Sequence, residues 1–441
     1  MTIQVSPVKE TTKVTAASQR AAYWTTLLEL AQASVSPVKG LEALREVAIA
    51  QAQPQAFPTT RDEEWRFTDL SALLDVKLSQ PDGTASLSAA DLEVYTLPEA
   101  NTSRIVFVNG QFSAALSDRT AIADAVYVGA LADAPEALVA KIGQVPDAED
   151  GFTALNSVGF QDAVVIHVPK NQVVDVPIHL LFVTVGDRPL FVHPRCLLVA
   201  EPNSAVTLVE EYVSLGTTPH LTNAVTEFVL AENAQVKHTR IQGDATTAFH
   251  IGKTAVSQER TSRYVGLTVD YGSQVSRHNL HVHQAGEQTE TVLNSLAYLR
   301  GEQTSDTHSA IALTQPHAQT RQLHKTIVDD RAHAVFNGKV FVPQAAQMTD
   351  AGQLNRNLLL SPKARVDTKP QLEIVADNVK CTHGATIGQL EADEVFYLQS
   401  RGIDADSARK LLIYAFAYEI LNELPVPSLK QRLLNQLHIA R

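Results

Sequence analysis

Cysteine is scarce in this sequence of 441 residues, which contains only two. So few thiols exclude a scaffold held together by disulfides and indicate a reducing compartment. No apolar run is long enough to cross a membrane, and residues 1–20 lack the apolar core of a secretory signal. We therefore expect a cytoplasmic protein that does not enter a membrane. The threonine-rich, acid-poor start leaves an organellar location as the alternative.

Positive charge is also in deficit. The formal net charge is -12, and no basic run with interleaved aromatic residues occurs. Because such a chain repels phosphate backbones, we expect no nucleic-acid partner. Hydrophobic residues make up 44% of the chain and charged residues 19%, which is typical of a globular protein with a sizeable core. The length predicts about three domains, unless one elongated core takes up most of the chain.

Residues 1–103 form the first of three parts that differ in pattern. Apolar residues at helical spacing predict a helix over 16–34 and a second helix after Gly40. Residues 62–70 begin with three acidic side chains, which predicts a short helix with an acidic first turn. Residues 80–103 are polar and rich in turn formers, which indicates a linker. We expect this helical region to pack as a separate small unit.

Residues 104–402 form the second part, in which short apolar or alternating runs recur about every dozen residues. The clearest runs are 164–168, 178–183, 197–200, 205–209, 224–230, 235–241, 264–270, 275–282 and 291–296. No long helix interrupts them. Each such strand buries its apolar face only by stacking on its neighbours, which favours an all-β solenoid or a β-sandwich. The pattern alone does not separate these two architectures.

Residues 403–441 form the third part, where helical spacing returns. Asp404 or Asp406 can cap a helix that is apolar almost all round. Two prolines end it, and Ser428 can cap a second helix. Either both helices pack on their own domain, or their excess apolar surface is a ledge for a partner protein. The candidate contact residues of such a ledge are Leu411, Leu412, Phe416, Tyr418 and Leu421.

One of the two cysteines lies two residues from a histidine, in Cys381-Thr382-His383-Gly384. In an extended strand, residues i and i+2 project to the same face about 7 Å apart, so both side chains could touch one iron or sulfur species. Gly384 would allow the backbone to turn after the pair. The alternative is a small buried cysteine beside a hydrogen-bonded histidine, with no role in chemistry.

Longer phrases surround this motif: Phe336-Asn-Gly-Lys-Val-Phe-Val342, Gln353-Leu-Asn-Arg-Asn-Leu-Leu-Leu-Ser-Pro-Lys-Ala-Arg-Val-Asp-Thr-Lys-Pro-Gln-Leu-Glu-Ile374, and Asp393-Glu-Val-Phe-Tyr-Leu-Gln-Ser-Arg-Gly402. Together with Glu63-Glu-Trp-Arg-Phe-Thr-Asp69 they resemble the SufB/SufD family of iron–sulfur cluster assembly proteins. His-Gly-Ala-Thr after Cys-x resembles the SufD branch. The SufB branch typically has His-Glu-Ala-Thr there and further N-terminal cysteines, which this chain lacks.

The resemblance implies a right-handed parallel β-helix for residues 104–402, flanked by α-helical regions. It also implies a non-catalytic scaffold subunit, not an enzyme, that pairs with a SufB-like paralogue and can form a homodimer in isolation. Its C-terminal helices, over residues 403–441, would bind the SufC-like ATPase of the ABC type. Cys381 and His383 would face the partner at a cluster-assembly interface that holds an iron–sulfur cluster transiently. Two cysteines cannot supply the four thiolates of a usual cluster, so we expect no cofactor or metal to stay bound to the isolated chain.

Two other functions can be considered from the sequence, but the residues that each would need are not all present. Gly252-Lys253-Thr254 ends like a phosphate loop, but Thr247 stands where that loop needs its first glycine. ATP would therefore have to bind to another chain. A β-helix acting on acidic polysaccharide would need converging carboxylates, and pairs such as Asp329-Asp330 carry no signature of such a site.

A cupin-type metal-dependent enzyme is the alternative function. His281 and His283 would share a strand face and, with Glu287, imitate the metal motif of cupin barrels. Against this, Asn294 stands where the motif has its closing glycine.

The basic residues near the motif have a structural interpretation beside a functional one, and the second cysteine has only a structural one. Lys363, Arg365 and Lys369 are either solvated, or they attract sulfide or persulfide anions toward Cys381. The other cysteine, Cys196, is followed by Leu-Leu-Val and is expected to be an inert core residue.

Overall fold

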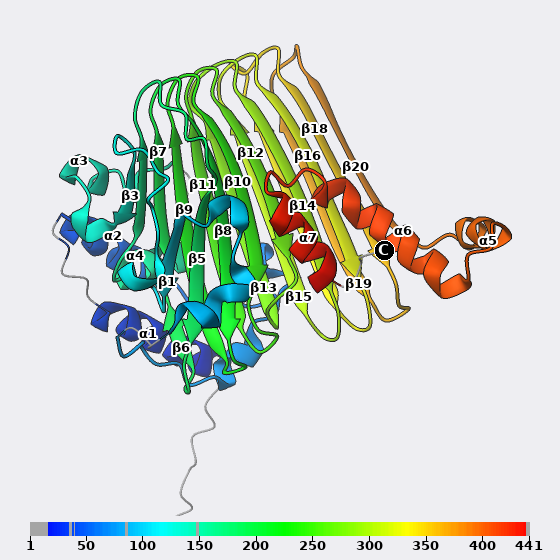
Figure 1. The fold of residues 1–441 in the computed structure, drawn as a ribbon, viewed down its shortest axis with the longest axis horizontal. Coiled ribbons are helices and arrows are strands. Elements are labelled where there is room, and N and C mark those ends of the chain that lie inside the picture. Colours follow the sequence, from blue (N-terminus) through cyan, green and yellow to red (C-terminus); the bar gives the residue numbers. More distant parts are fainter. Residues whose placement is uncertain (1–15, 35–37, 39, 84–86, 147–149, 438–441) are drawn as a thin grey trace, which may run out of the picture.

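The computed structural model describes residues 16–34, 38, 40–83, 87–146 and 150–437. The first fifteen residues, which include most of the segment considered as a secretory signal, and residues 438–441 lie outside the described residues. Strands stack into two long sheets that together form a β-solenoid of about eight turns, with helices at the two ends (Figure 1). The mainly β solenoid implied by the family resemblance is confirmed, and the β-sandwich is wrong.

Sheet I takes one strand from each turn. In spatial order it contains β2 (Gln111–Phe112), β1 (Arg104–Val108), β5 (Ile178–Val185), β8 (Ala205–Leu215), β10 (Gln235–Gly243), β12 (Arg263–Asp270), β14 (Glu290–Leu299), β16 (Gln319–Val328), β18 (Asp350–Leu359) and β20 (Lys380–Gln389). All neighbours are parallel except β1 and β2.

Sheet II takes the alternate strands. It contains β19 (Arg365–Ile374), β17 (His333–Val342), β15 (Thr304–Leu313), β13 (Val275–Gln284), β11 (Phe249–Gln258), β9 (His220–Leu230), β7 (Arg195–Ala200), β4 (Val164–Val168) and β3 (Tyr127–Ala130), while β6 (Leu190–Val192) pairs with β9. Only β3 and β4 are antiparallel. The nine runs identified in the sequence all fall within strands of these two sheets.

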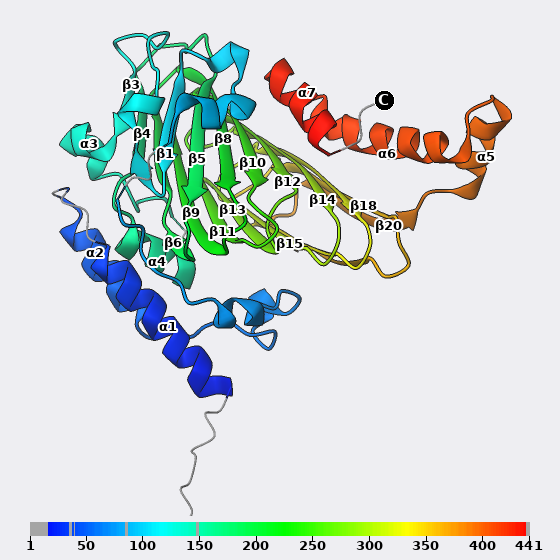
Figure 2. The same ribbon diagram turned by 60° about the horizontal axis from the view of Figure 1, so that its bottom comes forward.

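Among the described residues, four α-helices lie at the N-terminal end of the solenoid: α1 (Ala16–Ala33), α2 (Glu42–Ala52), α3 (Glu136–Val139) and α4 (Gly151–Gly159). Figure 2 shows α1 and α2 beside the strands. Trp24 and Leu27 of α1 share one apolar core with Leu221, Phe249 and Val275 of sheet II. The expectation of a separate small unit is therefore wrong, because the helices bury their apolar faces against the sheet.

Short 3₁₀ helices replace two other expected features. The helix expected over residues 62–70 is a single turn, Glu63–Trp65, whose N-terminal Asp62 makes no side-chain cap. The expected linker over residues 80–103 contains two such helices, Ala89–Tyr95 and Pro98–Ala100, and Leu92 within it is fully buried. This segment packs on the solenoid, because Leu92 shares an apolar core with strand residues such as Val106 and Leu181.

Up to residue 437, where the described structure ends, three helices follow β20: α5 (Ala392–Ser400), α6 (Ala405–Leu421) and α7 (Pro427–Gln436). Asp404 caps α6 by accepting hydrogen bonds from the N–H groups of Asp406 (3.1 Å) and Ser407 (2.9 Å), as predicted. The cap predicted at Ser428 is wrong, because α7 already begins at Pro427 and the Ser428 N–H donates to Glu99 (2.9 Å). None of the helices in the described ranges has the length and apolarity needed to cross a bilayer.

Candidate functional site

Both sheets end together at the C-terminal side of the solenoid. β20 is the last strand of sheet I and β19 the last strand of sheet II, at the open end seen beside α5 and α6 in Figure 1. Within the described part of the chain, no strand pairs with their outer edges. Unpaired N–H and C=O groups along two adjacent ten-residue strands are a template for strands of another chain.

Cys381 and His383 lie on β20 and project toward the interior of the solenoid. In the sheet register, Cys381 pairs with Ala351 and His383 pairs with Gln353, and both of these β18 residues are buried. Because β20 is the last strand, its inward face is open, so that Cys381 is half-buried and His383 is exposed. The two side chains therefore share one face at the open end, as their spacing predicts.

The turn expected at Gly384 is wrong. β20 continues through Gly384 to Gln389, and the backbone at Gly384 is not left-handed. The cysteine and histidine are thus placed at the end of the sheet because β20 is its last strand, and not because the chain turns after them.

The Cys381 thiol is not activated within this chain. Partial burial raises the pKa of the thiol, and the nearby Asp350 carboxylate raises it further, while a backbone hydrogen bond with Ala351 opposes them. Because the thiolate is the ligand form, an incoming metal or cation has to displace the proton. Throughout the described ranges, no three His, Cys, Asp or Glu side chains are grouped so that they could hold a metal ion. Cys381 and His383 offer two ligands to a metal, and any further ligands would have to come from residues other than these two.

The basic residues near the motif are mostly paired with acids. Lys369 Nζ lies 3.0 Å from Glu63 Oε1, and Arg365 Nε lies 2.8 Å from Asp367 Oδ2. Lys363 is exposed. Their positive charge is largely compensated, which favours the structural interpretation over the attraction of sulfide.

The cupin alternative is wrong. His281 and His283 lie on the outer face of β13, where they line a cavity of about 370 Å³. Glu287 lies in the following turn, where its Oε1 accepts a hydrogen bond from Arg260 Nε (3.1 Å). The three residues form no metal-holding group in the described structure, and the strands build a solenoid.

Two other motifs have structural roles. Gly252-Lys253-Thr254 lies inside strand β11, and Lys253 is buried with its Nζ 3.2 Å from Asp150 Oδ2, so this segment is not a phosphate loop. Cys196 is fully buried in β7, and burial raises the pKa of its thiol well above the ordinary value. Cys196 is an inert core residue, as expected.

Most of the apolar surface of α6 and α7 is used by this chain. Leu421 is fully buried in an apolar core with Leu296 and Ile327 on the outer face of sheet I. Leu421 is therefore not available as a contact residue of a ledge, which corrects that expectation. The other four candidates are only half-buried: Leu411, Leu412, Phe416 and Tyr418.

A more exposed apolar surface lies on α5, which the sequence pattern did not single out. α5 has no buried residue, and Phe396 and Tyr397 on it are 70% and 58% exposed. In Figures 1 and 2, α5 and the start of α6 project beyond β20, away from the solenoid. The only sequence signal was an aromatic pair in a short helical stretch after the last strand.

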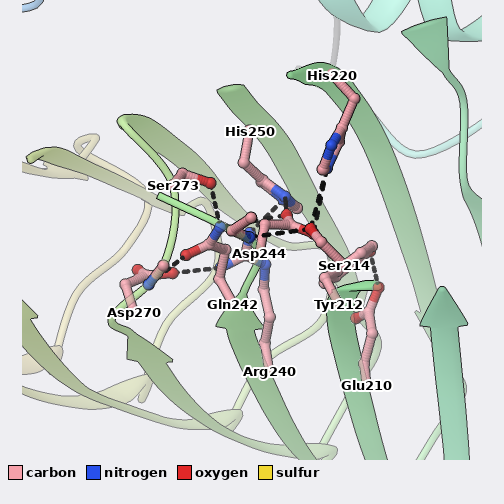
Figure 3. A network of polar contacts seen from close by, with 12 residues as sticks. Glu210, Tyr212, Ser214, His220, Arg240, Gln242, Asp244, His250, Asp270 and Ser273 are labelled. Atoms are coloured by element: carbon pink, nitrogen blue, oxygen red, sulfur yellow. Dashed lines mark hydrogen bonds and ion pairs between the residues drawn. The ribbon is translucent and has the colours of Figure 1, made fainter. Parts of the chain in front are cut away.

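A second set of chemically capable side chains is buried between the two sheets (Figure 3). His250 Nδ1 lies 2.8 Å from Asp244 Oδ2, and Arg240 Nη1 donates to Asp270 Oδ1 (2.9 Å). Burial alone would raise the pKa of Asp244, but hydrogen bonds with His220 and His250 outweigh it, so the pKa is lowered. Because these charges are paired with one another, they need no external ligand to be stable in the interior.

The chain matches two family models that together cover most of its length. Residues 182–416 match the SufBD core domain of SUF system FeS cluster assembly, and residues 19–180 match the SufBD protein N-terminal region. An iron–sulfur cluster assembly SufBD family protein of Synechocystis is 50% identical over 390 residues, which are 86% of either chain. The iron–sulfur cluster assembly protein SufD of Escherichia coli is 34% identical over 383 residues, which cover 86% of this chain and 88% of the relative.

The SufD protein of Bacillus subtilis is 28% identical over 416 residues, which cover 90% of this chain and 92% of the relative. The resemblance stated from the motifs is thereby confirmed along nearly the whole chain. This protein belongs to the SufB/SufD family of iron–sulfur cluster assembly proteins and is SufD-like within it.

Proposed function

We propose that this chain is a non-catalytic scaffold subunit that supplies Cys381 and His383 to a cluster-assembly site completed by a SufB-like paralogue. The observation that carries the proposal is the position of this pair on the last strand of sheet I, whose outer edge pairs with no other strand among the described residues. A thiolate is a soft ligand and an imidazole a borderline one, so both suit iron–sulfur species. A second solenoid that adds its strands to β19 and β20 would bring its own ligands to the same place.

The incomplete ligand set supports a transient cargo. Two side chains cannot fill the coordination sphere of an iron–sulfur cluster, which usually has four thiolates. The Cys381 thiol also stays protonated until a metal or a partner's charge lowers its pKa. We therefore propose that the cluster forms only at the interface between the two subunits and that the isolated chain retains none.

The test compares His383→Ala with the unaltered protein in the purified complex with its SufB-like and SufC-like partners. We expect bound iron and acid-labile sulfide to fall sharply, while complex formation and the melting temperature stay nearly unchanged, because His383 is exposed in the free chain. Cys381→Ser should give a milder loss, since the partner can supply the essential thiolate. His167→Ala, a partly exposed histidine on β4 at the other end, is the control.

Normal cluster content in His383→Ala would refute this role of the histidine. A loss of stability large enough to explain the missing cluster would instead make the motif structural.

We further propose that the SufC-like ATPase binds the projecting arm made of α5 and the start of α6. The proposal is supported by the exposed Phe396 and Tyr397 and by the half-buried Leu411 and Leu412, which together leave apolar surface without a described neighbour to cover it fully. No phosphate loop occurs in this chain, so the ATPase activity has to be supplied by the partner.

Leu411→Asp combined with Leu412→Asp should weaken capture of the ATPase by roughly tenfold or more, since an interface anchor is worth more than about 1.4 kcal/mol. The measurement is the apparent Kd for the ATPase subunit. Leu421→Ala is the matched control, because it lowers the melting temperature but leaves the arm surface unchanged. Full-strength binding by the double variant would place the ATPase elsewhere.

A further inference from the structure

Gln353 lies on β18, directly beside His383 in the register of sheet I. Its side chain points into the solenoid and the residue is only 3% exposed. Neither the amide oxygen nor the amide nitrogen has a hydrogen-bond partner in the described structure. A buried amide without partners has lost its hydrogen bonds to water and gained none in exchange, so native proteins rarely keep one without a reason.

Gly338, which has no side chain, leaves room for this amide. Gly338 on β17 faces Gln353 across the interior, and a Cβ at Gly338 would lie 2.3 Å from Gln353 Nε2, closer than real side chains approach. In the last turn of the solenoid, His383 pairs with Gln353 and Pro370 pairs with Gly338. The Gln353 side chain is therefore the inward-facing neighbour of His383 on β18, while its amide lies against Gly338 across the interior.

The neighbouring amides already have partners. On β18, Asn355 Nδ2 donates to the backbone carbonyl of His324 (3.2 Å), and Asn357 Nδ2 donates to the carbonyl of Thr386 (3.0 Å). On β16, Gln322 Oε1 accepts a hydrogen bond from Ser309 Oγ (3.0 Å). Of these inward-facing amides, Gln353 is the one with both ends unpaired, and it is the one beside the candidate ligand.

We propose that the Gln353 amide, unpaired in the described structure, positions the His383 imidazole when this exposed ring turns over it, by accepting a hydrogen bond from one ring nitrogen on the side-chain carbonyl. A neutral imidazole has one N–H and one lone pair, so this bond selects the tautomer that offers the other nitrogen to iron. The inference rests on the proposed role of His383 as a ligand. Gln353 acts through the histidine and is a positioning residue, in the way that metal-bound histidines generally donate their second ring nitrogen to an oxygen acceptor.

The test is NMR spectroscopy of the full chain labelled with ¹⁵N-histidine, in which the His383 signals are identified by their loss in His383→Ala. We expect a single His383 tautomer in the unaltered chain and a mixture of both in Gln353→Leu, which keeps the size of the side chain and removes the acceptor. Gln353→Glu retains an acceptor and should restore the single tautomer. Gln322→Leu, one turn deeper, is the matched control and should leave His383 unchanged.

Both tautomers in the unaltered chain, or a single tautomer that persists in Gln353→Leu, would overturn the proposal. If Gln353→Leu does not fold, Gln353→Met replaces it, because its unbranched side chain is closer in shape to glutamine. In the assembled complex, Gln353→Leu should lower iron affinity by about 10- to 100-fold, the usual loss when the hydrogen-bond partner of a metal-bound histidine is removed.

The two proposals fail in different ways. If the tautomer depends on Gln353 but His383→Ala retains normal cluster content, the hydrogen bond stands and the ligand role of His383 falls. If His383→Ala loses the cluster but the His383 tautomer is the same in Gln353→Leu, the ligand role of His383 stands and the hydrogen bond with Gln353 falls.

Discussion

At one corner of successive turns of the solenoid, a single residue takes a left-handed backbone conformation. Asn171, Asn203 and Asn233 do so with φ between 58° and 62°, and their amides form a chain of 2.9 Å hydrogen bonds from one turn to the next. Asparagine tolerates this conformation. Thr261 occupies the same corner of the next turn with φ 56°, where a β-branched residue is strained.

Thr261→Asn should therefore stabilise the protein by about 1 kcal/mol, since it relieves the left-handed strain and can extend the amide chain from Asn233. The measurement is the midpoint of urea unfolding. Asn233→Thr is the reciprocal control and should lower that midpoint. An unchanged or lower midpoint in Thr261→Asn would show that the strain at this corner is small.

At the scale of elements, the Glu63–Trp65 turn is held against sheet II by a small polar network. The Arg277 guanidinium lies 4.1 Å over the Trp65 ring and donates to Asp306 (2.9 Å). His308 lies between two carboxylates, with Nδ1 3.3 Å from Glu64 Oε2 and Nε2 3.0 Å from Asp306 Oδ1. The turn is thus fastened to the sheet through a histidine that can carry a charge.

The protonation of His308 should make this attachment depend on pH. Burial lowers the pKa of His308, but the charge of Asp306 and hydrogen bonds with Asp306 and Glu64 outweigh it, so the pKa is raised. The hydrogen bond with His308 lowers the pKa of Glu64 against the effect of burial. A raised histidine pKa stabilises the attachment below about pH 6.5, and this is lost as the pH rises through the folded pKa. The carboxylates stay ionised down to about pH 4, so attachment should be firmest near pH 5 to 6.

Hydrogen exchange of backbone amides in residues 59–70 would measure this attachment. We expect faster exchange, corrected for intrinsic pH effects, at pH 8 than at pH 6. His308→Gln should remove the difference, because glutamine can hydrogen-bond but does not titrate. The same pH dependence in His308→Gln would assign it to another group.

At the scale of the whole molecule, the open end is the surface through which the solenoid can continue. Besides two strand edges that no strand in the described part of the chain pairs with, this end exposes Ile387 on β20 (49%) and Ile374 on β19 (40%). An exposed strand edge with apolar side chains favours association. In the absence of a paralogue, a second copy of this chain is the available partner, which would give the homodimer expected from the family resemblance.

Ile387→Lys should convert such a homodimer to a monomer, because the amine would be buried without a partner at the joint. Sedimentation equilibrium of the isolated chain measures this. Val47→Lys is the control, since Val47 is 54% exposed on α2 at the other end. Association that survives Ile387→Lys would place the dimer contact away from the open end.

The sequence by itself determined the succession of a helical start, a β-rich middle and a helical end, because local apolar spacing distinguishes helices from strands. The helix at 16–34, the runs from 164 to 296 and the cap at Asp404 could all be read from neighbouring residues. Cys381 and His383 could likewise be placed on one face of a strand. The choice of a solenoid over a sandwich needed the family resemblance, because both architectures bury the same alternating strands.

Only the tertiary structure decided which surfaces remain uncovered. Leu421 and Phe396 both look like apolar helix residues in the sequence, yet the first is buried on sheet I and the second is exposed on a projecting helix. The unpaired amide of Gln353 was equally invisible, since its neighbours His383 and Gly338 come from other strands. Burial and hydrogen bonding depend on contacts between residues that are far apart in the sequence, which local spacing does not encode.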